Sequence, residues 1–124
     1  MNWAITIVAA VVIVTFFVLK RLSFVSAAVA QKYLAEGALV IDVRSREEFR
    51  SGNLPTALNI PLSELRESLG SRVKDKNQVL LLHCLSGGRS AIAKRHASNL
   101  GYPRVFNLGS LARAKRIINE SRAE

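Results

Sequence analysis

An uncharged apolar segment at the start of the chain sets the first limit on its fold. From Trp3 to Leu19 there are 17 residues, almost all Ala, Ile, Val, Phe or Leu. As a helix they extend about 26 Å, close to the shortest length that spans the hydrocarbon core of a membrane. Such a helix is apolar on every side, so it has no polar face to turn towards water. The fold of a water-exposed domain therefore has to come from the residues after it.

The basic pair Lys20 and Arg21 directly follows this segment, and no basic side chain precedes it. The positive-inside rule then places the basic end in the cytoplasm. We predict a single-pass protein of the inner (cytoplasmic) membrane, with residues 1–21 as the anchor and its basic flank, and residues 3–19 in the bilayer. Residues 22–124 form the cytoplasmic domain, which is long enough for a small α/β fold with a modest core.

Two other interpretations of the apolar segment stay open. A cleaved signal peptide would use the small residues Ala28-Val29-Ala30 as its cleavage site. Against it, the segment lacks a positively charged start, and a basic pair lies before the site. A buried core helix is disfavoured because the segment is terminal and apolar on every side.

The charge balance is strongly basic, with 18 Lys and Arg against 9 Asp and Glu. The basic residues are scattered, few aromatic residues lie among them, and no nucleic-acid-binding motif is present, so we expect no nucleic acid as partner. An anionic membrane surface or an anionic substrate explains the charge more simply. A single cysteine excludes an internal disulfide bond.

Residues 22–124 alternate between helical and strand patterns. Apolar spacing and capping residues predict helices at 26–36, 45–50, 63–69, 90–100 and 110–121, and strands at 38–41, 57–60, 78–83 and 104–107. The sequence Ser45-Arg46-Glu47-Glu48 predicts a capping box at the start of the second helix. Strands separated by single helices indicate βαβ units and a mainly parallel sheet. Ligands bind at the carboxyl ends of such strands, which is where Asp42, Arg44 and Cys84 fall.

The lone cysteine, Cys84, lies on a glycine-containing loop between an apolar strand and a helix start. The backbone N–H groups of residues 85–89 can curl towards its sulfur, because Gly87 and Gly88 tolerate unusual backbone angles. A helix start and the nearby Arg89 would lower the pKa of the thiol. We therefore predict a reactive thiol in an anion-binding cradle, although a buried structural cysteine is the more common fate of a lone Cys.

Five segments together resemble the rhodanese domain family in its single-domain, membrane-anchored form. They are Leu39-Val40-Ile41-Asp42-Val43-Arg44, Glu48-Phe49, Gly52-Asn53-Leu54-Pro55, Ala57-Leu58-Asn59-Ile60-Pro61-Leu62 and Cys84-Leu85-Ser86-Gly87-Gly88-Arg89-Ser90. Their order and spacing cover roughly residues 24–109. The resemblance implies an α/β, rhodanese-like, three-layer domain with a mainly parallel central sheet.

The same resemblance implies a sulfurtransferase that moves sulfane sulfur through a persulfide on Cys84. Thiosulfate or a related compound would be the donor, and cyanide or a thiol, including a protein thiol, the acceptor. Arg89 would hold the donor anion, and the loop of Leu85, Ser86, Gly87 and Gly88 would stabilise the persulfide. Asp42, Arg44 and Ser90 are expected as supporting residues, and no cofactor is implied.

Other functions are weighed on specific residues. Cysteine phosphatases and arsenate reductases with a related His-Cys start have five residues between Cys and Arg, whereas this chain has four, Leu85 to Gly88. The shorter loop suits a sulfur atom better than a phosphate group. A non-catalytic or sulfur-relay binding module at the membrane is the main alternative. Two histidines and one cysteine without zinc spacing predict no metal site.

Overall fold

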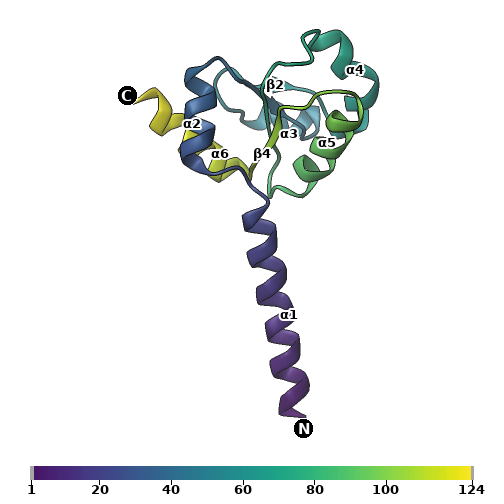
Figure 1. Cartoon of the computed structure of the whole chain (residues 1–124), viewed down its shortest axis with the longest axis vertical. Coiled ribbons are helices and arrows are strands. Elements are labelled where there is room, and N and C mark those ends of the chain that lie inside the picture. Colours follow the sequence, from purple (N-terminus) through teal and green to yellow (C-terminus); the bar gives the residue numbers. More distant parts are fainter. Residues whose placement is uncertain (1, 124) are drawn as a thin grey trace.

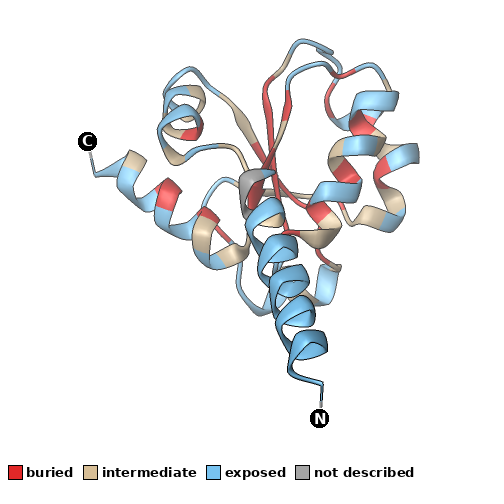
Figure 2. Cartoon of the chain, turned by 60° about the horizontal axis from the view of Figure 1, so that its bottom comes forward, coloured by how far each residue is buried: buried red, intermediate tan, exposed pale blue. Residues whose placement is uncertain are grey.

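The computed structural model describes residues 2–123 and shows a rod-like helix attached to an α/β domain (Figure 1). The rod is α1 (Trp3–Leu22), and its Trp3–Lys20 stretch is the one helix among the described residues that is long and apolar enough to cross a membrane. None of that stretch is buried inside the molecule, as the pale-blue rod in Figure 2 shows. The interpretation as a buried core helix is therefore wrong.

Four parallel strands form the central sheet of the domain in the order β2-β1-β3-β4. Their bounds are β1 (Leu39–Asp42), β2 (Leu58–Asn59), β3 (Leu80–His83) and β4 (Val105–Gly109). The two central strands are buried along nearly their whole length, which is why their sequences are continuous apolar runs rather than alternating ones. The prediction of a mainly parallel sheet is confirmed.

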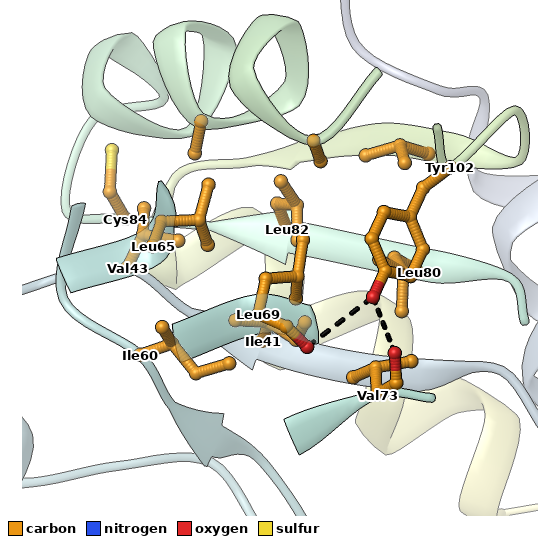
Figure 3. Packing of buried hydrophobic residues seen from close by; sticks show 13 residues of the cluster. Ile41, Val43, Ile60, Leu65, Leu69, Val73, Leu80, Leu82, Cys84 and Tyr102 are labelled. Carbon is orange, nitrogen blue, oxygen red and sulfur yellow. Dashed lines mark hydrogen bonds between the residues drawn. The ribbon is translucent and has the colours of Figure 1, made fainter. Parts of the chain in front are cut away.

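Helices cover both faces of this sheet and make the three predicted layers. On one face lie α2 (Ala27–Ala35) and α6 (Leu111–Arg122); on the other lie the 3₁₀ helix η1 (Leu62–Glu64), α4 (Leu65–Arg72) and α5 (Gly88–Asn99). Leu80 and Leu82 of β3 face one apolar cluster, and Leu81 faces the other. Figure 3 shows the first cluster, which includes Cys84 at one end.

The short helix α3 (Arg46–Ser51) lies beyond the carboxyl end of β1, and the capping box predicted for it is present. The Ser45 hydroxyl accepts a hydrogen bond from the Glu48 backbone, and the Glu48 carboxylate accepts one from the Ser45 backbone N–H. This reciprocal pair satisfies two helix-end donors and fixes the position of the Glu48 side chain.

Two of the helix boundaries that differ from the prediction lie next to glycines. Gly70 was expected to end its helix, but α4 continues to Arg72, and the buried Tyr102 hydroxyl donates to the Leu69 and Val73 carbonyls at that end (Figure 3). The following α5 begins at Gly88, two residues before the predicted start, because Gly87 with φ +98° serves as its left-handed N-cap. The glycines predicted as loop thus build the helix start itself.

Candidate active site

The end of β3 delivers Cys84 to the start of α5 and buries it. Its side chain is 1 % exposed, and its backbone N–H donates to the Gly109 carbonyl at 3.3 Å. The Gly87 backbone N–H donates to the Cys84 Sγ atom at 3.0 Å. The positive φ of Gly87 allows this tight return of the chain, which a side-chain-bearing residue would resist. Of the backbone N–H groups predicted to turn towards the sulfur, that of Gly87 makes a hydrogen bond to it.

Two buried polar residues, Ser90 and Asn107, lie next to the thiol and hydrogen-bond to each other. The Ser90 Oγ atom lies 3.6 Å from Cys84 Sγ and 2.8 Å from Asn107 Oδ1. The Asn107 amide also joins the loop to β4, because its Nδ2 donates to the Gly87 carbonyl at 3.1 Å and its Oδ1 accepts from the Gly109 N–H at 2.9 Å. A hydroxyl has one hydrogen, so Ser90 can donate either to Asn107 or to a Cys84 thiolate.

These donors change the acidity of the thiol. Burial by itself would raise the pKa of Cys84, but hydrogen bonds from the Ser90 backbone and hydroxyl and from the Gly87 and Ser86 N–H groups outweigh it and lower the pKa below its ordinary value. The thiolate is the nucleophilic form of cysteine. The cradle therefore increases the fraction of Cys84 in the thiolate form at a given pH.

Replacing Ser90 by alanine should raise the pKa of Cys84 by a measurable amount. Loss of the hydroxyl donor raises the pKa of Cys84, so the thiolate fraction at neutral pH falls and the thiolate titration moves to higher pH. We expect persulfide formation at neutral pH to slow several-fold and to recover at alkaline pH. Thiolate ultraviolet absorbance against pH measures the shift, and Ser98→Ala on the exposed side of α5 is the control. An unchanged titration in Ser90→Ala would contradict this role.

Arg89 follows the cradle loop directly, and its guanidinium is already ion-paired with the Glu48 carboxylate. Its Nη1 and Nη2 donate to the two Glu48 oxygens at 2.6 and 3.0 Å. This pair lowers the pKa of Glu48 from 4.5 to about 2 and raises the pKa of Arg89. The nearby Cys84 also contributes to raising the pKa of Arg89. The folded pKa of Glu48 is depressed, so the pair's contribution to stability is present above pH 4.5 and is lost as pH falls towards 2. An anion that binds the Arg89 guanidinium would have to share or displace this carboxylate.

A hollow of about 540 Å³ opens next to Arg89 at the carboxyl edge of the sheet. It lies between the segments that follow β1 and β2, and its lining includes Val43, Ser45, Pro61, Leu62 and Arg89. Its lining also includes the Glu47 and Glu64 side chains, whereas neither Cys84 nor loop residues 85–88 are among the residues that line it. The hollow therefore gives access to the Arg89 guanidinium rather than to the sulfur itself.

Asp42 and Arg44 form a buried ion pair at the same edge of the sheet. Arg44 Nη2 lies 2.7 Å from Asp42 Oδ2 and donates to the Gly52 carbonyl at 2.8 Å, and the two residues are 4 % and 0 % exposed. His83, the strand residue before Cys84, has its Nε2 atom 3.9 Å from Asp42 Oδ2, and burial lowers its pKa. The Asp42–Arg44 ion pair thus connects the end of β1 to the turn at Gly52.

The structure brings most of the predicted site residues together around Cys84. Leu85 is exposed at the tip of the loop, and Ser86 bridges to Ser110 before α6. Asn107 and Glu48 were not among the predicted site residues. An asparagine inside an otherwise apolar strand pattern was the available signal for Asn107. Among residues 2–123 no group of His, Cys, Asp and Glu side chains is arranged to hold a metal ion.

Comparison with known proteins agrees with this geometry. The model of the Rhodanese-like domain family matches residues 26–112. Thiosulfate sulfurtransferase PspE of Escherichia coli is 39 % identical over 71 residues, 57 % of this chain and 68 % of that protein. Human thiosulfate:glutathione sulfurtransferase is 38 % identical over 87 residues, 60 % of this chain and 76 % of that protein.

Solved structures show the same fold. A structure described as rhodanese with anions from E. coli has a TM-score of 0.60 at 36 % identity and aligns with 62 % of this chain and 91 % of that one. The human single-domain sulfurtransferase TSTD1 has a TM-score of 0.61 at 33 % identity, over 79 % and 96 % of the two chains. A cysteine held by a loop and helix start at the carboxyl edge of a parallel sheet, with a family match over most of the α/β domain, places this chain in the rhodanese-like domain family.

Proposed function

We propose that the chain, a rhodanese-type sulfurtransferase, moves sulfane sulfur from thiosulfate or a related donor to a thiophilic acceptor through a persulfide on Cys84. The observation that carries the proposal is the cradle in which the Gly87 N–H and the Ser90 hydroxyl reach the same sulfur atom. The names of the chain's relatives, thiosulfate sulfurtransferase and thiosulfate:glutathione sulfurtransferase, support the same donor class.

The reaction divides into two displacements at sulfur. The Cys84 thiolate attacks the outer sulfur of thiosulfate, a new S–S bond forms, and sulfite leaves with the electron pair of the broken bond. The persulfide then occupies the cradle, where the loop N–H groups stabilise its terminal negative charge. An acceptor thiolate or cyanide attacks the outer sulfur and releases the Cys84 thiolate, so two half-reactions alternate.

Intact-mass spectrometry of the purified full chain after exposure to thiosulfate tests the covalent step. We expect a gain of one sulfur atom, and its loss again after addition of cyanide. A folded chain that gains no sulfur from thiosulfate or from an alternative sulfane donor would instead support the binding-module function.

Substitutions of Arg89 and Glu48 should change the KM for thiosulfate in opposite directions. Arg89→Ala removes the cation that faces the anion, so we expect the thiosulfate KM to rise about tenfold, the scale of one charged hydrogen bond. Glu48→Gln keeps the capping box but releases the guanidinium, so the KM should fall several-fold. Initial rates against thiosulfate concentration measure both, with Glu47→Gln on α3 as the control. A KM that moves in the same direction in both variants would refute the competition.

The cellular location belongs to the same proposal. Residues 1–21 anchor the chain in the inner membrane, and residues 22–124 form the catalytic domain in the cytoplasm. The uncharged Trp3–Leu19 segment followed by Lys20 and Arg21 supports this topology. Protease treatment of intact spheroplasts tests it: the domain should be protected until the cells are lysed.

A further inference from the structure

The segment between α1 and α2 is fastened to the catalytic loop by Phe24. Its ring fills space that two glycines leave open: a Cβ atom on Gly87 would lie 2.7 Å from Phe24 Cζ, and one on Gly109 would lie 3.0 Å from Phe24 Cδ2. The Arg113 guanidinium lies over the same ring and donates to the Val25 carbonyl at 2.6 Å. The start of the domain is therefore fixed to the edge of the sheet that carries Cys84.

This attachment limits how far the catalytic loop can lie from a membrane that holds α1. Phe24 comes four residues after Lys20, where the apolar stretch ends. Four residues span at most about 14 Å when fully extended. The tether keeps Phe24, and the Gly87 loop that it touches, near the bilayer surface whatever angle α1 adopts.

Cationic side chains flank the linker on both sides. One hollow is lined by Lys20, Phe24, Ser86 and Arg116, and another by Ser23, Lys94 and Arg95, with no Asp or Glu among the lining residues described for either. Arg95 and Arg116 are exposed and Lys94 is half-buried. Figure 1 shows α1 leaving the domain between α5 and α6, the helices that carry these residues. We call Phe24, Lys94, Arg95 and Arg116 the linker face.

We propose that the linker face docks on an anionic phospholipid surface and holds the Cys84 loop towards the membrane. The inference rests on the membrane anchorage proposed above. Cations next to a transmembrane helix are drawn to anionic headgroups, and the attraction acts over about 8–10 Å at physiological salt. Within the described residues, Lys94, Arg95 and Arg116 make no ion pair that would consume their charge. A sulfur acceptor or donor held at the membrane surface would then lie close to the Cys84 loop.

Paramagnetic relaxation in nanodiscs tests this orientation on the full chain. The discs contain phosphatidylcholine with a headgroup spin label, with or without phosphatidylglycerol, and the backbone amides of the domain are observed by NMR. We expect residues 86, 95 and 116 to be broadened several-fold more than residues 36 and 75 at the opposite edge. Phosphatidylglycerol should increase this contrast, and added inorganic phosphate should not abolish it.

Two triple variants that each remove three positive charges test whether the linker face causes the phosphatidylglycerol-dependent broadening. K94Q/R95Q/R116Q should lose the phosphatidylglycerol-dependent part of the broadening. K32Q/R72Q/K74Q, which removes exposed cations from the last turn of α2, the end of α4 and the loop after α4, should keep it. Uniform broadening over the domain, or equal loss in both variants, would overturn the docking. Persulfide formation on Cys84 and retention of the chain in the discs are measured on the same samples, so failure of the catalytic or anchoring proposal is seen separately.

Discussion

Replacing Cys84 by serine should abolish sulfur transfer and leave the fold intact. A serine hydroxyl can occupy the same hydrogen-bonded position, but it neither ionises near neutral pH nor forms a persulfide. Loss of a catalytic nucleophile typically lowers kcat by about 10³-fold or more. We expect thiocyanate production from thiosulfate and cyanide to fall to background, and the variant to gain no sulfur in the intact-mass measurement.

The fold of the serine variant has to be checked on the same sample. Because the exchanged atom is buried and similar in size, far-ultraviolet circular dichroism and the thermal unfolding midpoint should stay close to those of the parent chain. Thiocyanate production at the parental rate in Cys84→Ser would show that the sulfur does not travel through this residue.

Replacing Asp42 by alanine should strongly lower the free energy of unfolding. Its carboxylate accepts hydrogen bonds from the Arg44 backbone and side chain at 2.7–3.0 Å, and both residues are buried. Asp42→Ala leaves the Arg44 guanidinium buried without a counter-charge, which costs about 3–5 kcal/mol. Domains of this size are stable by only about 5–15 kcal/mol. Urea unfolding of the full chain in a mild detergent measures the loss.

An exposed ion pair in the same chain provides the matched control. Arg46 and Glu64 also lie 2.7 Å apart, but their side chains are 60 % and 37 % exposed. Glu64→Ala should therefore cost no more than about 1 kcal/mol. The double variant Asp42→Ala/Arg44→Ala should lose less than the sum of its single variants, since no buried charge is left alone. Equal costs for Asp42→Ala and Glu64→Ala would show that burial adds nothing to the pair.

Local sequence signals predicted the features that depend on neighbouring residues. The capping box of Ser45 and Glu48 needs only a spacing of three residues, so it could be read directly and is present. Leu80, Leu81 and Leu82 form an uninterrupted apolar run, and that pattern identifies a strand covered on both faces. The order of strands and helices followed from such signals, and with it the edge of the sheet at which Cys84 lies.

Features that depend on distant residues could not be predicted in this way. Asn107 on β4 meets Ser90 on α5, 17 residues away along the chain, and neither segment alone indicates the contact. Glu48 was expected to cap its helix, but its pairing with Arg89 joins positions 41 residues apart. The extension of α4 past Gly70 likewise goes with the Tyr102 hydroxyl, which comes from the segment after α5. In each case tertiary contact decides what local preference leaves open.

The location of Asn107 on β4 also sets when the loop around Cys84 gains its buried support during synthesis. The ribosome releases α1 and β3 before β4, so for a time the growing chain carries Cys84 while Ser90 and Gly87 still lack their partner on β4. Parallel strand pairing closes only after the intervening helix has emerged. The Gly87 carbonyl and the Ser90 hydroxyl therefore gain their Asn107 partner only when the last strand pairs with β3. The contact that ties the cysteine loop to the rest of the sheet is thus among the last to form.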